Sequence, residues 1–178
     1  ANRLAPHGLT LFGNPAWARA MALSQGAFAA FTPGPPARSH DDLLNIYNAS
    51  LISVNLPQSF ISESFQYRLL DVMSSNALLV TKRTPEPDLY RVFGPDCPVP
   101  MYDSLAELEA ICAHYLAHEA ERRAIVAACN ALVTPDFSFR SRSLDYLRLA
   151  GVAYRPADVA ATGPRQVLLH TDEGFLLP

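Results

Sequence analysis

The stretch ISESFQYRLLDVMSSNALLV, Ile61 to Val80, joins a helical pattern directly to a strand pattern. A helix that begins after Ser62 would carry one apolar stripe for packing on a sheet. The residues of this stripe, at positions i, i+4, i+7 and i+8, are Phe65, Leu69, Val72 and Met73. The apolar run ALLVT that follows (77–81) predicts a strand. A helix that leads into a buried strand indicates part of a βαβ unit.

Other short apolar runs alternate with helical patterns along the chain. These runs are GLTLF (8–12), AFAAF (27–31), LISVNL (51–56) and CPVPMY (97–102). We expect a Pro-rich loop at 32–40, in which Ser39 caps a helix over 40–49, and a short helix near PDLYRVF (87–93). Helical patterns resume from 103 to about 150, with breaks near His118 and at Pro135.

This alternation predicts an α/β fold, a Rossmann-like, doubly wound parallel sheet in a single domain. We expect the domain to span residues 1–150 and leave the structure of the tail, 151–178, open. In such sheets ligands bind beyond the carboxyl ends of the strands. The loops after the strands are therefore the places to look for a site.

Composition excludes several classes of protein. The chain has 178 residues, 49% hydrophobic and 17% charged, which is enough to bury one core. A net charge of -3 argues against a surface that binds nucleic acid. No apolar run approaches the roughly 18 residues of a membrane span, and no export signal precedes the first strand. We therefore expect a cytoplasmic protein.

The cysteines and the absence of catalytic signatures narrow the chemistry. Cys97, Cys112 and Cys129 are odd in number and lack C-x-x-C spacing, which predicts reduced, buried thiols. No D-x-D motif and no local Ser/His/Asp or Cys/His signature is present. The sequence thus identifies no catalytic residue, and we expect no cofactor.

Two acids frame the quoted helix. Glu63 stands in its expected first turn, where free backbone N–H groups favour an anion. Asp71 lies eight residues on, about 12 Å along a helix axis. That separation suits a diphosphate between two hydroxyl-rich groups, with Arg68 holding the second acid or a phosphate oxygen. A helix-dipole contact and a solvated ion pair would explain the same residues.

Other polar residues follow strands at the expected ligand edge. Asn14, in the turn GNP, could approach a phosphate with its backbone, or could simply form the turn. Ser59 and Ser62 could donate to a phosphate, although helix capping is a sufficient role for Ser62. Lys82 and Arg83 could offset phosphate charge, or could be a solvated basic pair.

Several further groups are interpreted as structural. His114 and His118 have a spacing that can hold a metal, but no third ligand is evident, so a solvent-facing helix is favoured. Charged residues interpreted as helix-surface charge are Glu121, Arg122, Arg123, Arg140 and Arg142. Aromatic residues that could stack on a base, but are interpreted as core, are Tyr47, Phe65, Tyr67 and Tyr102.

The segment ESFQYRLLDVMSSNALLV resembles the E-x7-E segment of GT-B glycosyltransferases, in which two acids precede a stretch of small residues and a strand. The wider chain is similar to the spore-maturation-protein-like glycosyltransferases over roughly 42–150. The matching pieces, in order, are Asn55, Arg68, DLYRVFG, VPMYDSLAELEAI, HYLAHEAERRAIVAACNALV and Ser138-Phe139-Arg140-Ser141-Arg142.

This resemblance implies the donor-binding C-terminal half of a GT-B enzyme, which transfers a sugar from a nucleoside diphosphate sugar to an acceptor hydroxyl. It implies that Glu63 lies near the donor sugar and that Asp71 binds the ribose. A missing N-terminal domain or a partner subunit would supply the acceptor site. One alternative is a non-catalytic nucleotide- or partner-binding module, favoured by Asp71 in place of Glu and Asn76 in place of Gly. Another is an unrelated flavodoxin-like domain.

Overall fold

The computed structural model describes residues 4–12, 32–56, 66–84, 88–133, 137 and 139–152. The chain divides into two compact units, residues 1–137 and residues 138–178. The first unit contains the described strands, and the second contains helix α7 (Phe139–Leu149).

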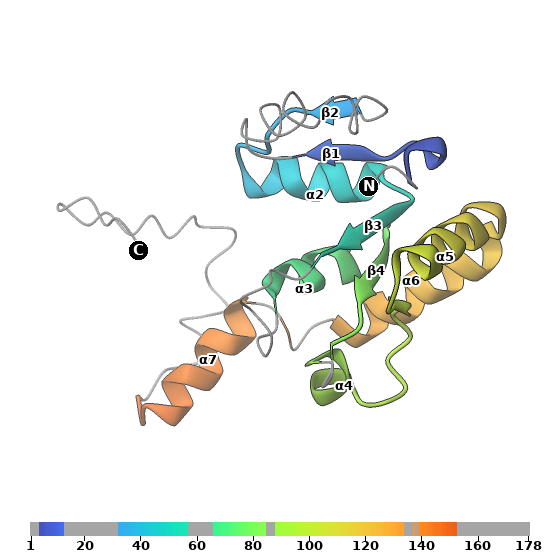
Figure 1. The fold of residues 1–178 in the computed structure, drawn as a ribbon. Coiled ribbons are helices and arrows are strands. Elements are labelled where there is room, and N and C mark those ends of the chain that lie inside the picture. The colour runs from blue at the N-terminus through green and yellow to red at the C-terminus, as the bar shows by residue number, and fades with distance from the viewer. Residues whose placement is uncertain are drawn as a thin grey trace. The chain divides into compact units, whose positions relative to one another are not determined.

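Three parallel strands form the central sheet. β3 (Ile52–Asn55) pairs with β4 (Leu78–Lys82), and β4 pairs with β5 (Met101–Tyr102). β3 and β4 lie side by side in Figure 1. The strands predicted at 51–56 and 77–81 are confirmed within about a residue, whereas CPVPMY contributes only its last two residues to a strand.

Helices connect the strands. α3 (Tyr67–Met73) lies between β3 and β4 in the chain, and α4 (Asp88–Phe93) lies between β4 and β5. Parallel neighbours need such crossovers, because each connection must return the chain to the same end of the sheet. α5 (Leu105–Ala117) and α6 (Glu119–Val133) follow β5 and pack against each other (Figure 1). The predicted α/β fold with a parallel sheet is confirmed.

The side chains of β4 alternate between two hydrophobic clusters, because successive strand residues point to opposite faces. Leu79 belongs to the cluster on the side we call the α3 face, and Leu78 and Val80 belong to the cluster on the α5 face. Other buried members of the α3 face are Tyr47, Leu69, Val72, Met73, Ala77, Leu89, Cys97, Val99, Met101, Cys129 and Val133. Other buried members of the α5 face are Leu4, Tyr102, Leu108 and Cys112.

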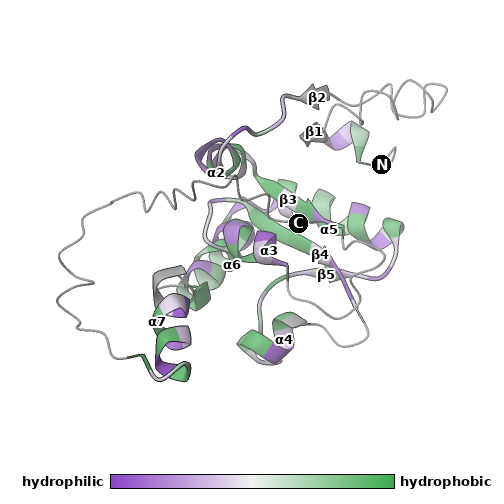
Figure 2. Cartoon of the chain, turned by 90° about the vertical axis from the view of Figure 1, so that its left-hand side faces the viewer, coloured by the Kyte–Doolittle hydropathy of each residue, from purple (hydrophilic) through white to green (hydrophobic). Residues whose placement is uncertain are grey.

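Coverage of both faces explains the composition of the central strands. Figure 2 shows β3 and β4 mostly in the hydrophobic colour, while the helices carry both colours. Strands buried on both sides are expected to be apolar almost throughout, because neither face meets water. The sheet is therefore wound on both sides, as the sequence predicts.

Helix α2 (His40–Ala49) begins where Ser39 predicts. Ser39 Oγ accepts a hydrogen bond from the Asp42 N–H at 3.1 Å, and the Asp42 carboxylate accepts from the N–H of Ser39 at 3.1 Å. This reciprocal capping box satisfies backbone donors that the first turn leaves unpaired. The sequence fixes the helix start locally, without help from distant contacts.

The N-terminal part contains the 3-10 helix η1 (Ala5–His7) and a parallel pair, β1 (Thr10–Phe12) with β2 (Thr32–Gly34). The strand predicted at 27–31 lies outside the described residues. The loop predicted from residue 32 was wrong in its first three residues, which form β2. Proline is tolerated there because both strands of a two-stranded sheet are edge strands.

Helix α3 is shorter than predicted. It begins at Tyr67, with Gln66 as an N-cap residue in extended conformation, so the predicted start after Ser62 was wrong. A serine followed by an acid is a weak local signal for a helix start, and tertiary packing can override it. The buried residues of α3 are Leu69, Val72 and Met73, as the predicted apolar stripe requires.

Burial corrects two further interpretations. Arg122 was predicted on the helix surface, but only 6% of it is exposed, and its Nη1 donates to the Leu51 carbonyl at 3.5 Å. The rotation of α6 against the sheet, which charge alone does not reveal, buries this side chain. Tyr67 was interpreted as core and is 72% exposed, whereas Tyr47 and Tyr102 are buried as predicted.

The three cysteines are free and buried, as predicted. Burial raises the pKa of the Cys112 thiol to about 11 and that of Cys129 to about 12. The thiolate is the reactive form, so these side chains serve as small apolar residues. Within the described part of the chain, no helix combines the length and the apolar character needed to cross a membrane.

Candidate functional site

The three central strands end together at what we call the carboxyl edge. β3 ends at Asn55, β4 at Lys82 and β5 at Tyr102. Because the strands are parallel, these ends lie at the same side of the sheet. Open α/β sheets bind ligands beyond this side, so its polar residues are the first candidates for a site.

Hydrogen bonds tie the strands together at the carboxyl edge. Asn55 Nδ2 donates to Thr81 Oγ1 at 3.0 Å, and the Tyr102 hydroxyl donates to the Asn55 carbonyl at 3.4 Å. Asn55 is 3% exposed, and within the described residues its Oδ1 accepts no hydrogen bond. An unpaired buried acceptor costs about 1–3 kcal/mol. The unpaired Oδ1 of Asn55 therefore costs the fold free energy, while the Nδ2 of the same side chain is hydrogen-bonded.

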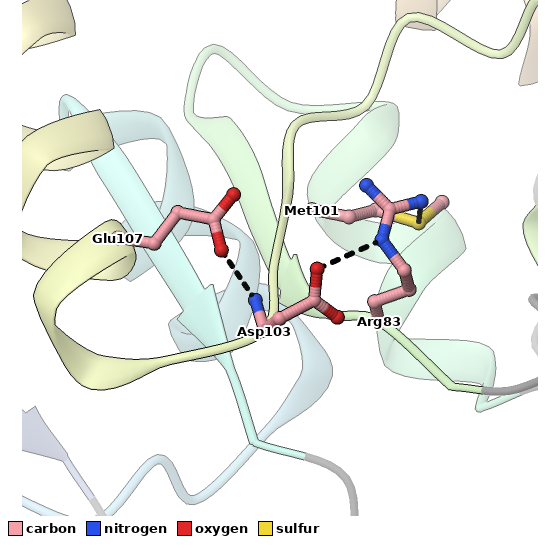
Figure 3. A network of polar contacts seen from close by, with 4 residues as sticks. All are labelled: Arg83, Met101, Asp103 and Glu107. Carbon is pink, nitrogen blue, oxygen red and sulfur yellow. Dashed lines mark hydrogen bonds and ion pairs between the residues drawn. The ribbon is translucent and has the colours of Figure 1, made fainter.

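A second polar network, drawn in Figure 3, continues the same edge. The backbone N–H of Arg83 donates to the Tyr102 carbonyl at 2.9 Å, which extends the pairing of β4 and β5 by one residue. Arg83 Nε donates to Asp103 Oδ2 at 3.3 Å, and Nη1 lies 4.0 Å from Met101 Sδ. Interactions with Tyr90 and then with Asp103 raise the pKa of Arg83, which favours the charged guanidinium.

The start of α5 fixes the loop that carries Asp103. Figure 3 shows Asp103 between Glu107 and Arg83. The Asp103 N–H donates to Glu107 Oε2 at 2.8 Å, and the Glu107 N–H donates to Ser104 Oγ at 3.2 Å. These bonds satisfy backbone donors at the helix start. They also hold the carboxylate that orients Arg83.

Asp71 lies in the second half of α3 and is half-buried. Burial raises the pKa of its carboxyl, while electrostatic interactions with His40 and Arg68 act in the opposite direction. Among the described residues, its carboxylate has neither a hydrogen-bond nor an ion-pair partner. The arrangement leaves a partly desolvated acceptor between α2 and α3 that can take hydrogen bonds from a ligand.

Three predicted site residues lie within the described chain. Arg68 is exposed, and its charge acts on Asp71, so the structure brings these two together. Lys82 is the exposed last residue of β4 and shares the alternation of Leu78 and Val80, which face α5. The predicted site residues that lie outside the described chain are Asn14, Ser59, Ser62 and Glu63.

The sequence interpretation did not select the partners of Arg83. A signal for them was available, because Ser104 and Glu107 have the S-x-x-E spacing of a capping box directly after a strand. Asp103 precedes this box and follows β5, at the expected ligand edge. The sequence points to Asn55 only through the family resemblance. Its pairing with Thr81 depends on the register of β3 and β4, which the sequence does not supply.

The histidine pair does not form a metal site in the described residues. The His114 and His118 rings stack with centroids 4.1 Å apart, and His114 Nε2 lies 2.8 Å from Glu121 Oε2. Both side chains are exposed, as predicted for a solvent-facing helix. No group of three or more His, Cys, Asp or Glu residues that could hold a metal is found in the described ranges.

Comparison with known proteins identifies the relationship of the chain at the family level. A family model described as Glycosyl transferase-like matches residues 2–148. Comparison with the curated proteins and with the solved structures finds no match. The matched range includes the central sheet, the carboxyl edge and Asp71.

Proposed function

The chain belongs to the glycosyl transferase-like family, and we propose that it is the donor-binding, C-terminal half of a GT-B glycosyltransferase. It would bind a nucleoside diphosphate sugar whose sugar is transferred to an acceptor hydroxyl, as in the spore-maturation-protein-like members. Residues 1–150 would form the nucleotide-sugar-binding domain, followed by the tail, 151–178. An N-terminal domain or a partner subunit would supply the acceptor site.

The observation that carries this proposal is the state of Asp71. A half-buried carboxylate without a hydrogen-bond partner among the described residues has lost part of its hydration without replacement. Two ribose hydroxyls can supply the missing donors, and a carboxylate accepts such bonds at both oxygens. Burial raises the pKa of Asp71, and interactions with His40 and Arg68 oppose this shift and support the ionised form that accepts hydrogen bonds from hydroxyls.

Basic residues support binding of the diphosphate. Lys82 lies at the carboxyl edge, Arg83 follows it directly, and Arg68 lies one helical turn from Asp71. Positive charge placed where the leaving diphosphate develops negative charge stabilises the transition state more than the ground state. Other donor contacts proposed from the sequence involve Asn14, Ser59, Ser62 and Glu63, with Glu63 near the donor sugar.

A non-catalytic module that binds a nucleotide or a protein partner is the second candidate. Asp71 is one methylene shorter than the acid of the family pattern, which reduces its reach to a ribose. Asn76 occupies the position of the family glycine, and its N–H donates to Asn48 Oδ1 at 3.0 Å, which connects this turn to α2. These two substitutions favour a fold that is retained without catalysis.

Nucleotide titration of the folded chain tests the donor proposal. UDP and GDP, measured by calorimetry, are expected to give saturable binding to at least one of the two. Asp71→Ala should weaken that binding about tenfold or more, because a hydrogen bond to a charged group contributes roughly 1.5–3 kcal/mol. Asp71→Glu, which restores the acid of the family, should keep saturable binding.

The control is Asp96→Ala, which removes an exposed acid from the turn after α4. Equal losses for Asp71→Ala and Asp96→Ala would contradict a specific role for Asp71. Absence of any nucleotide binding would favour the partner-binding module. Glycosyl transfer that appears only when an N-terminal domain is added would separate half an enzyme from a binding module.

A further inference from the structure

Arg83 lies at the carboxyl edge on the face that α3 covers. Leu79 is in the α3-face cluster, and alternation along the strand places Thr81 and then Arg83 on the same side. The contact of Arg83 Nη1 with Met101 Sδ agrees, because Met101 belongs to that cluster. Lys82 faces the opposite side, so of the two basic residues Arg83 shares a face with the helix that carries Asp71.

The Arg83 guanidinium is held in place and still accessible. Asp103 and Met101 contact it, and the backbone N–H of Asp103 in turn donates to Glu107 (Figure 3). These contacts leave some of the five N–H donors of an arginine unused. The Arg83 side chain remains 40% exposed. A guanidinium that is already oriented loses less entropy when it binds a further anion.

We propose that Arg83 contacts the diphosphate of the donor nucleotide, and that Asp103 is a positioning residue that orients Arg83 for this contact. The inference rests on the proposed donor-binding function and adds to it a specific phosphate ligand. Arginine matches phosphate because its planar fork presents parallel N–H groups to two oxygens. One edge of the guanidinium bonds Asp103, and another can bond a phosphate oxygen.

The competing explanation is an exposed ion pair with no function. Such pairs contribute little to stability, with a median of about 0–1 kcal/mol. Removal of either partner would then leave nucleotide binding unchanged. Three variants separate the two explanations, and each is measured by calorimetric titration with two matched pairs, UDP with UMP and GDP with GMP.

Arg83→Ala should weaken binding of the diphosphate, UDP or GDP, roughly tenfold to a hundredfold. Binding of the matching monophosphate should weaken much less. The decisive quantity is the ratio of the affinity for the diphosphate to that for the monophosphate, because a general loss of structure would weaken binding of both nucleotides. Arg83→Lys should recover only part of this advantage, since an ammonium group cannot bond a carboxylate and a phosphate with a fixed fork. Full recovery would reduce the role of Arg83 to charge alone and would overturn the proposal.

Asp103→Asn distinguishes positioning from simple electrostatics. Removal of a negative charge near the site should strengthen diphosphate binding if only Coulomb forces act. We expect weaker binding instead, because the neutral amide holds Arg83 less firmly. Stronger or unchanged binding would contradict the positioning role.

The matched control is Arg123→Ala, which breaks an exposed pair with Glu119 at 2.6 Å on α6. It should leave the affinities for both members of each pair unchanged. If the wild-type chain binds neither UDP nor GDP, the proposed function fails and this inference fails with it. If Asp71→Ala weakens binding but Arg83→Ala does not, the donor function stands and the role of Arg83 is refuted.

Discussion

The two faces of the central sheet differ in polarity. The α5 face closes on apolar side chains such as Leu78, Val80 and Leu108. The α3 face has an apolar cluster of its own, but toward the carboxyl edge it also carries Thr81 with its partner Asn55. Buried polar groups cost free energy unless they are hydrogen-bonded. The buried cluster of the α5 face is therefore suited to stability alone, whereas the α3 face adds polar groups at the edge where open α/β sheets bind ligands.

The largest expected effect tests the α5 face. Leu78→Ala should lower the free energy of unfolding by about 2–5 kcal/mol, because Leu78 is completely buried and its truncation leaves a cavity. Denaturant unfolding measures the change. In the fraction that stays folded, nucleotide affinity should equal that of the wild-type chain. A weakened affinity would show that the α5 face also contributes to binding and would break the comparison.

A pair of near-isosteric changes at neighbouring positions sharpens the contrast. Thr81→Val should cost about 1–3 kcal/mol of unfolding free energy, because Asn55 Nδ2 loses its acceptor inside the protein. Val80→Thr should cost a similar amount for the opposite reason, since it buries a hydroxyl on an apolar face. Both are read from chemical denaturation. A neutral Thr81→Val would mean that the Asn55 pairing does not stabilise the edge.

The smallest effect concerns pH. Burial raises the pKa of Asp71 in the folded protein above its ordinary value of 3.8, so the folded state holds the proton more tightly than the unfolded state. The stabilisation that comes from this tighter proton binding is therefore complete below pH 3.8, and it is lost as the pH rises through the pKa of Asp71 in the folded protein. Asp71→Asn should remove this loss, and unfolding measured across the acid range compares the two proteins. Identical pH profiles would show that the carboxylate is fully hydrated.

Sequence patterns were sufficient where structure is determined by near neighbours. Ser39 and Asp42 set the start of α2, and the apolar run after residue 76 became β4. Sequence patterns were insufficient where the decisive contact is made with a residue far away in the chain. Arg122 is buried against the carbonyl of Leu51, 71 positions away, although its neighbours in HEAERR read as a solvated surface.

The candidate site divides in the same way. Local spacing was enough to predict that Asp71 and Arg68 lie close together, since the two residues are three positions apart on one helix. The ion pair of Arg83 with Asp103 could not be predicted from local spacing. Asp103 follows a different strand and lies beside Arg83 only because β4 pairs with β5.

The sequence by itself determined the α/β class, the alternation of strands with helices, the burial of the three thiols and the position of Asp71 on a helix. Periodicity and capping act over a few residues, so they can be read from the sequence. Tertiary structure alone decided where α3 begins, which face each basic residue takes and which charges are buried. Those outcomes depend on strand register and helix rotation, and both are set by packing between segments that are distant in the chain.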